Sequence, residues 1–240
     1  MSLNSEILKK IGRNPYFCPN ITNVEKTAQQ TIPLYYQITT FTTISDNGHN
    51  LRGGSNPQYS WLMDTYNREQ KFIMEVYLCR IFYLLIKNQK MNIKELSQYF
   101  INSKLFNSDQ TQIILIGLKK YFEEDYVSAM HILVPQFESF LLEIASKLGT
   151  NIVALDTKLD IATRTLTLSE NHLESDDFKK VFGEDFCRQI KFILFEPLGY
   201  KLRHKIAHGE IKFGECNFQN TTLILYLYLY LLGRFNVTKK

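Results

Sequence analysis

The residues best suited to chemistry stand close together near the end of the chain. The segment 202–209, LRHKIAHG, places Arg203, His204, Lys205 and His208 within six residues. An arginine keeps its charge at every physiological pH, whereas an imidazole gains and loses a proton near neutrality. A fixed cation beside a proton carrier suits phosphodiester cleavage, in which negative charge builds on phosphate oxygens while protons move. The segment therefore predicts a site for phosphate chemistry.

The surrounding residues predict that this segment lies at the start of a short helix. Pro197 and Gly199 interrupt the chain just before it, and Gly209 favours a stop directly after it. Leu202 and Ile206 are four residues apart, so both face the same side of a helix and can anchor it in a core. The basic side chains between Leu202 and Ile206 then point away from the core.

Helix geometry sets a condition on Arg203 and His208. Positions five apart on a regular helix are rotated by about 140° and separated by about 7.5 Å along the axis. The two side chains therefore do not converge on one atom through backbone placement alone. Three arrangements remain open: the long arginine side chain wraps round the helix, the turn is distorted, or a second subunit completes the site.

The spacing of Arg203 and His208, with a polar residue directly after the arginine, resembles the Arg-x4-6-His motif of the HEPN superfamily (higher eukaryote and prokaryote nucleotide-binding domains). Many members of that superfamily are ribonucleases that need no metal ion. The resemblance implies a mainly α-helical, HEPN-like bundle. It also implies the third arrangement above, with paired motifs facing each other across a homodimer cleft.

A closer resemblance is to an uncharacterised bacterial domain family that pairs an LVPQ(I/F)E helix with an LR(N/H)xxAHG motif. Here LVPQFE occupies residues 133–138, after Asp125, Tyr126 and Ala129, and LRHKIAHG follows about 65 residues later. The likeness covers about residues 117–212. His204 stands where such motifs most commonly carry asparagine, so it does not necessarily take over the role of that amide.

The resemblance implies a role for each polar residue of the motif. His208 would act as general base on the RNA 2′-hydroxyl or as general acid on the leaving oxygen. Arg203 would hold the scissile phosphate, and His204 would orient it or share proton transfer with the second subunit. The product would be a 2′,3′-cyclic phosphate, and no metal or cofactor would be needed. Non-specific attraction to the RNA backbone would come from Lys201, Lys205 and Lys212.

Other interpretations of the motif stay open. A basic cluster at a helix end can simply complement the helix dipole, and the domain would then be a non-catalytic dimerisation, nucleotide-binding or RNA-binding module. His204 and His208 also have the i, i+4 spacing of zinc-binding helices. Lys205 stands where such helices carry glutamate, and its positive charge argues against a metal.

Helical periodicity dominates from residue 59 onward. A helix is expected over residues 124–149, kinked at Pro135 and ended by Gly149. On it, Glu138 lies among apolar residues; we expect it to face solvent, with an ion pair to the basic motif as the alternative. Shorter helices are expected around 93–105, from an N-cap at 107–108, and around 185–195.

Two apolar helices complete the expected fold. A helix over about 67–88 is expected to bury one face, and the last helix, about 217–235, is apolar nearly all round and suits a subunit interface. The predicted division is an irregular or β-containing region at 1–58, a helical region at 59–122 and a HEPN-like helical domain at 123–240. A turn is expected at 46–48, after a β-prone stretch. The face expected to be buried on the first of these helices consists of Phe72, Val76, Cys79, Tyr83 and Ile86.

Composition limits the choice of protein class. The chain has 240 residues and a net charge of +4, which allows nucleic acid as a partner without requiring it. The four cysteines lack the spacing of zinc or redox sites, and no apolar run resembles a signal peptide or a membrane span. We expect a cytoplasmic, homodimeric endoribonuclease of the toxin or antiphage-defence kind, with RNA as substrate and an antitoxin or other regulator as a further partner.

Overall fold

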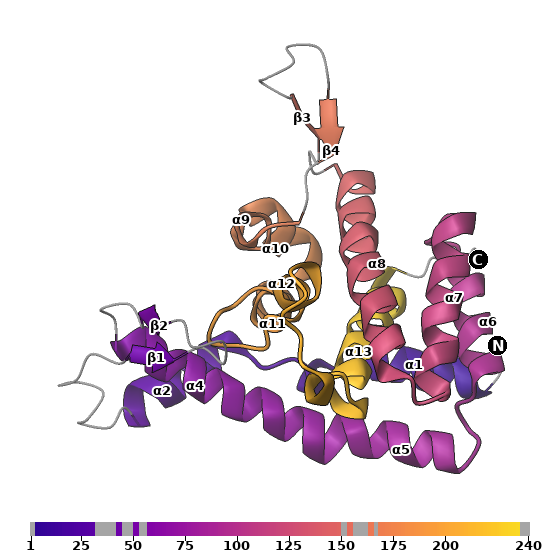
Figure 1. The fold of residues 1–240 in the computed structure, drawn as a ribbon, viewed down its shortest axis with the longest axis horizontal. Helices are drawn as coiled ribbons and strands as arrows, with labels where there is room; N and C mark the ends of the chain where they lie inside the picture. Colours follow the sequence, from indigo (N-terminus) through magenta and orange to yellow (C-terminus); the bar gives the residue numbers. More distant parts are fainter. Residues whose placement is uncertain are drawn as a thin grey trace.

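The computed structural model is mainly α-helical (Figure 1). It describes residues 3–31, 42–44, 50–52, 57–149, 153–155, 163–165 and 168–235. The helices are α1 Leu3–Arg13, α2 Ile21–Thr31, α4 Pro57–Phe72, α5 Cys79–Lys87, α6 Ile93–Ser103, α7 Ser108–Phe122, α8 Tyr126–Lys147, α9 Glu170–Glu174, α10 Asp176–Phe182, α11 Glu184–Leu194, α12 Leu202–Ala207 and α13 Phe218–Phe235.

Shorter elements connect these helices. Two are 3₁₀ turns, η1 Pro15–Phe17 and η3 Phe213–Glu215, and η2 Ile73–Leu78 is a π-helical segment between α4 and α5. The backbone also forms two antiparallel strand pairs, β1 Thr42–Ile44 with β2 Asn50–Arg52 and β3 Val153–Leu155 with β4 Thr163–Thr165. The turn predicted at 46–48 lies outside the described residues.

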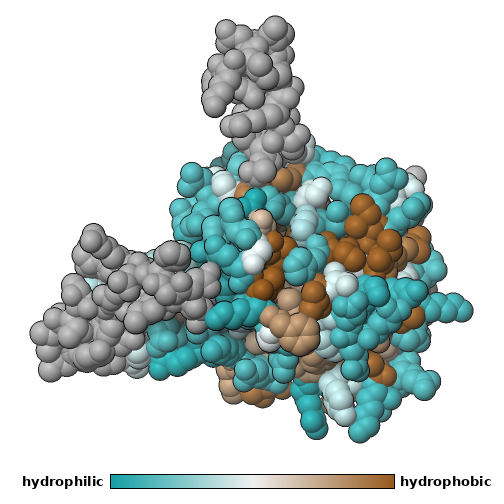
Figure 2. Space-filling view, viewed as in Figure 1, coloured by the Kyte–Doolittle hydropathy of each residue, from teal (hydrophilic) through white to brown (hydrophobic). Residues whose placement is uncertain are grey.

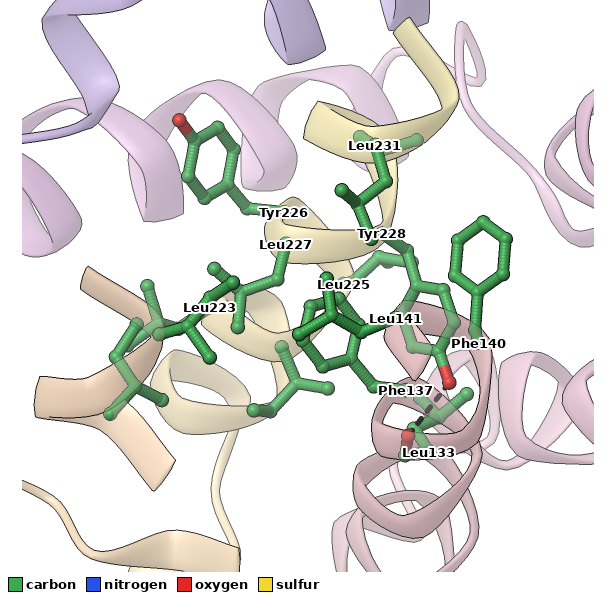
Figure 3. Packing of buried hydrophobic residues seen from close by; sticks show 14 of the residues in the cluster. Leu133, Phe137, Phe140, Leu141, Leu223, Leu225, Tyr226, Leu227, Tyr228 and Leu231 are labelled. Atoms are coloured by element: carbon green, nitrogen blue, oxygen red, sulfur yellow. Dashed lines mark hydrogen bonds between the residues drawn. The ribbon is translucent and has the colours of Figure 1, made fainter. Parts of the chain in front are cut away.

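Helix α13 is the centre of the core. It packs against α1, α8, η2 and α5, and its apolar side chains are buried almost without exception. Figure 3 shows its leucines and tyrosines meeting Phe137, Phe140 and Leu141 of α8, where the Tyr228 hydroxyl donates to the carbonyl oxygen of Leu133 at 2.7 Å. The prediction that this helix forms a subunit interface is therefore wrong, because its own chain already covers it.

The described N-terminal helices also pack into the interior, α1 in the main apolar cluster and α2 in a second, smaller one. Helix α1 lies along α13, with Leu8 and Ile11 buried, and α2 packs on α4 through Val24 and Ala28. The prediction of an irregular region is therefore wrong for residues 3–31. The main apolar cluster extends from Leu8 to Leu232, so the predicted divisions after 58 and 122 do not separate independent cores.

The predicted helix at 67–88 exists, but of the five residues of the predicted buried face only Cys79 and Ile86 pack against the core. Helices α4, η2 and α5 form one continuous helical run from 57 to 87 (Figure 1). Phe72, Val76 and Tyr83, expected inside, are exposed, whereas Met74 and Phe82 are buried. The run is apolar on two sides, and its π segment changes the number of residues per turn, so a fixed helical period assigns the wrong side.

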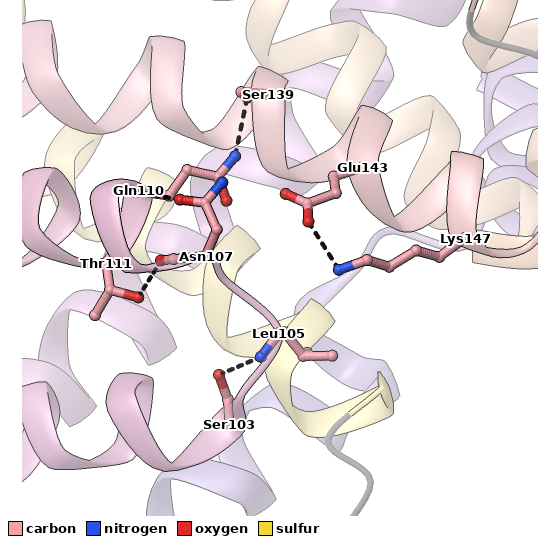
Figure 4. A network of polar contacts seen from close by, with 8 residues as sticks. All are labelled: Ser103, Leu105, Asn107, Gln110, Thr111, Ser139, Glu143 and Lys147. Atoms are coloured by element: carbon pink, nitrogen blue, oxygen red, sulfur yellow. Dashed lines mark hydrogen bonds and ion pairs between the residues drawn. The ribbon is translucent and has the colours of Figure 1, made fainter.

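Local capping signals predicted the helices around α7 and α8. Asn107 caps α7, since its Oδ1 accepts from the backbone N–H of Gln110 at 2.8 Å, and the Gln110 side chain donates to Ser139 of α8 at 3.1 Å (Figure 4). Helix α8 continues through Pro135 as a single helix. The helices predicted around 93–105, 185–195 and 217–235 are confirmed. Among the described helices, none is long and apolar enough to cross a bilayer.

Gly12 provides a test of the α1–α13 contact. A Cβ at Gly12 would lie 1.9 Å from the carbonyl oxygen of Leu229, although alanine is the better helix former. We expect Gly12→Ala to lower the free energy of unfolding by about 3 kcal/mol, because α1 has to move away from α13. Urea unfolding measures the change. Gly214→Ala, where a Cβ meets nothing within 4 Å, is the matched control; equal stability of the two variants would contradict the close contact.

Candidate functional site

The predicted motif forms the short helix α12. The chain reverses before it: the Tyr200 N–H donates to the carbonyl of Phe192 at 3.1 Å, and a Cβ at Gly199 would lie 2.2 Å from that same oxygen. Lys201 then adopts a left-handed conformation with φ of 54°. Leu202 is fully buried, which fixes the first turn in the core as predicted. The helix ends before Gly209, whose φ is 68°.

Arg203 is held by a carboxylate of α8. Its Nε donates to Oε2 of Glu138 at 3.1 Å, and the other carboxylate oxygen accepts from the backbone N–H of Leu168 at 3.0 Å. The two charged side chains are only 15% (Glu138) and 27% (Arg203) exposed. The expectation that Glu138 faces solvent is therefore wrong. The alternative, an ion pair that positions the basic motif, is what the structure has.

This ion pair leaves most of the guanidinium available. Arginine has five N–H donors in a plane, and the contact with Glu138 uses the one on Nε. The guanidinium carbon also lies 5.8 Å from the ring centre of buried Phe195, which restricts the plane further. Within the described residues, the terminal amino groups of Arg203 make no hydrogen bond. They are therefore available to donate hydrogen bonds to an anion.

The two imidazoles lie side by side at the end of α12. Their ring centres are 4.3 Å apart, with an angle of 45° between the planes. His204 Nε2 is 3.9 Å from Oε2 of Glu210, and the His208 ring is exposed with no hydrogen bond inside the described part of the chain. Burial lowers the pKa of His204 from its usual 6.5, and the positive charges of Lys201 and His208 add to that effect.

A loop after the motif folds back onto α12. The backbone N–H of Glu210 donates to the carbonyl of Lys205 at 2.7 Å, and the ammonium of Lys205 forms an ion pair with Glu215 in η3. The other oxygen of Glu215 accepts from the backbone N–H of Lys212 at 3.0 Å. Lys205 therefore holds this loop against α12 through its ion pair with Glu215.

The structure thus brings only part of the predicted site together. His204 and His208 contact each other, whereas Arg203 is directed to α8 and none of the described contacts joins it to His208. Glu210 and Glu215 were missed by the sequence interpretation, since acidic residues in a loop carry no periodic signal. The described residues contain no group of three or more His, Cys, Asp or Glu side chains that could hold a metal ion.

Comparison with known proteins adds no relative. No family model, no curated protein and no solved structure matches this chain. The likeness to the HEPN superfamily therefore rests on the two sequence motifs alone.

A double-mutant cycle tests the ion pair of Glu138 and Arg203. We expect Glu138→Ala to cost about 2 kcal/mol of unfolding free energy, because it leaves the arginine and the Leu168 N–H without their acceptor. The cycle with Arg203→Ala should give a coupling energy of about 1–2 kcal/mol by urea unfolding.

Glu143 provides the control for this cycle. It lies on the same helix and pairs at 2.7 Å with Lys147, whose side chain is 58% exposed (Figure 4). Glu143→Ala should lower the free energy of unfolding by less than about 0.5 kcal/mol. A coupling energy near zero between Glu138 and Arg203 would show that the contact stabilises nothing.

The lowered pKa of His204 is testable by NMR. We expect its imidazole to titrate below 6.5, and the midpoint to rise in Lys201→Asn, which removes a neighbouring charge while asparagine tolerates the left-handed backbone. Because the folded chain then binds fewer protons at His204 than the unfolded chain, stability falls as the pH drops from 6.5 towards the lowered pKa. A midpoint that is the same in both proteins would contradict this assignment of the cause.

Proposed function

We propose that this protein is a metal-independent endoribonuclease of the HEPN type. The observation that carries the proposal is the pair of imidazoles of His204 and His208, 4.3 Å apart at the end of the helix that also carries Arg203. Two proton carriers and a permanent cation are the groups that cleavage of RNA through its own 2′-hydroxyl requires.

In the proposed reaction the 2′-oxygen attacks the adjacent phosphorus, and the bond from phosphorus to the 5′-oxygen breaks. One imidazole accepts the proton of the 2′-hydroxyl, and a second donates a proton to the leaving 5′-oxygen. Exposed His208 is the candidate for the first contact with RNA. His204 suits proton acceptance, since its lowered pKa keeps it neutral at pH 7. The product carries a 2′,3′-cyclic phosphate.

Arg203 supplies the fixed charge in this proposal. Its Nε is occupied by Glu138, which orients the guanidinium, and the terminal amino groups would donate to the oxygens of the scissile phosphate. Because Arg203 and His208 do not meet within one chain, we propose that a second copy brings its own His208 to the phosphate. Lys201 and Lys212 add attraction to the RNA backbone.

The ion pair itself favours a second candidate, a non-catalytic dimerisation, nucleotide-binding or RNA-binding module. A carboxylate beside Arg203 reduces the net charge that the arginine offers to a phosphate. In such a module the pair would serve to fasten α12 to α8. RNA would then be bound or ignored, but not cut.

The cellular setting is a proposal of its own. By analogy with the HEPN superfamily, we propose a toxin or antiphage-defence effector, held by an antitoxin or another regulator. Growth arrest on expression, relieved by His208→Ala, would support this setting, and normal growth with active enzyme would oppose it.

Cleavage of RNA in EDTA tests the proposed function. We expect the purified protein to cut a short labelled RNA, and Arg203→Ala and His208→Ala each to lower the rate by at least about 100-fold, as loss of one charge-stabilising or proton-transfer group does. The exposed histidine of α8 gives the control His131→Ala, which should retain full activity. An RNA with a 2′-deoxy nucleotide at the cleavage position should stay intact. Intact RNA in every sample, or full activity in either site variant, would overturn the assignment.

A further inference from the structure

The most exposed large apolar side chain of the described residues lies in the loop that follows the motif. Phe213, in η3, is 85% exposed and packs against neither apolar cluster. Apart from Tyr16, every other large apolar side chain in the described part of the chain is at most 54% exposed. Exposure alone assigns no role, since single apolar residues on a surface are common. The way in which Phe213 is held, and the groups beside it, give it one.

The loop that carries Phe213 is ordered by hydrogen bonds along its whole length. The four carbonyl oxygens of residues 212–215 all accept hydrogen bonds. Two accept from backbone N–H groups, at 2.9 and 3.1 Å, and two accept from the side-chain amides of Asn217 and Asn220, both at 2.8 Å. Because the loop is already ordered, its ring can meet a ligand without the entropy cost of ordering a flexible segment.

The same loop is fastened to the helix of the motif. The ammonium of Lys205 on α12 forms an ion pair with Glu215 of η3, and the backbone N–H of Ile211 donates to the carbonyl of Lys205 at 3.2 Å. Phe213 therefore stands five residues after His208, in a loop attached to the last turn of α12. The exposed ring and the two imidazoles thus belong to one connected unit, α12 with its loop.

The surroundings of the ring leave room for a strand of nucleic acid. A Cβ at Gly214, the next residue, would meet no atom within 4 Å. The acidic residue of η3 is already engaged through both oxygens, since Glu215 pairs with Lys205 and accepts from the backbone N–H of Lys212 at 3.0 Å. Its charge is therefore largely balanced before a phosphate arrives.

An unpaired nucleobase is the ligand that matches an exposed ring beside a phosphate site. Bases of single-stranded RNA stack on aromatic side chains, and every base has a face that can do so. In a duplex these faces are covered by the neighbouring base pairs, so an exposed ring of this kind meets only unpaired nucleotides. A small free anion would use the cations of the motif and would gain nothing from Phe213.

We propose that Phe213 is the stacking platform for an unpaired base of RNA, close to the phosphate that Arg203 holds. The inference rests on the proposed function in taking RNA as the ligand of the motif. It goes beyond that function in two ways: it restricts the substrate to single-stranded RNA, and it assigns a binding residue outside α12. Because stacking accepts every base, this contact adds affinity without reading sequence.

Two other exposed groups lack one of these properties. Ile113 and Ile116 on α7 are exposed, and apolar side chains gather over α7 in Figure 2, but aliphatic side chains have no flat face for a base. Tyr16 has a ring that is 82% exposed, but it lies on η1, between α1 and α2, and not in the motif or its loop. Tyr16→Ala is therefore the matched control, since it too removes an exposed ring from a 3₁₀ turn.

Binding of an RNA that cannot be cut tests the proposal apart from catalysis. The probe is a short fluorescein-labelled single strand with methylated 2′-oxygens, and fluorescence anisotropy with the full chain measures its affinity. Phe213→Ala should weaken binding at least about fivefold, as loss of one stacked base does. Phe213→Leu should weaken it as well, because leucine is apolar without a flat ring, whereas Phe213→Tyr should retain the affinity. Tyr16→Ala should bind like the unaltered protein, with all variants folded by circular dichroism.

Strand pairing gives a second measurement on the same proteins. When the probe is annealed to its complement, the difference between the unaltered protein and Phe213→Ala should disappear, because the base faces are covered. A difference that persists with the duplex would contradict stacking on an unpaired base.

Several other results would overturn the proposal. They are no binding by the unaltered protein, equal affinity in Phe213→Ala, full affinity in Phe213→Leu, and a loss in Phe213→Tyr or Tyr16→Ala as large as that in Phe213→Ala. A Phe213→Ala protein whose sedimentation changes while its RNA affinity does not would assign the ring to a protein contact instead.

Failure of the inference and failure of the proposed function can be told apart. Binding that depends on Phe213, with unmodified RNA left intact in EDTA, defeats the proposed function alone. Cleavage of RNA in EDTA with the same KM in Phe213→Ala as in the unaltered protein defeats the inference alone.

Discussion

The burial of α13 is the constraint on which the rest of the structure depends. A helix that is apolar on all sides has to be covered on all sides, and α1, α8, η2 and α5 provide the cover. Helix α8 gives the largest aromatic contacts and ties its backbone to α13 through the Tyr228 hydroxyl. Because the same helix carries Glu138, the packing of the core also fixes the carboxylate that holds Arg203. The packing of α8 on α13 thus positions the motif through Glu138 and Arg203.

The ion pair of Glu138 and Arg203 decides the electrostatics of the site. Arg203 and Lys205 each have a carboxylate partner, so the site is less positive than its sequence suggests. A phosphate would be recognised by directed hydrogen bonds from an oriented guanidinium more than by a strong surrounding field. Burial of both partners makes the orientation firm, and the additional N–H of Leu168 offsets part of the cost of removing the carboxylate from water.

The sequence predicted those features that depend on neighbouring residues. The cap at Asn107, the breaks before α12 and the stop at Gly209 follow from local chemistry, and the structure has all three. It did not predict features that depend on distant residues. The ion pair of Glu138 with Arg203, 65 residues away, was only the alternative to a solvent-facing Glu138, because nothing near Glu138 in the sequence decides between the two. Helix α1 was missed because its few apolar residues are buried only against α13, at the other end of the chain.

Two helical segments, α13 and the run through η2, are apolar on more than one side, and they differ in how far they are buried. From sequence the last helix was the natural candidate for a subunit interface, yet α13 finds cover on every side within its own chain. The run through η2 does not, because Met74, Leu78 and Phe82 face the core while Phe72, Val76 and Tyr83 stay exposed. The last helix, predicted to suit a subunit interface, is thus covered by its own chain, whereas exposed apolar side chains lie on the helical run that contains η2.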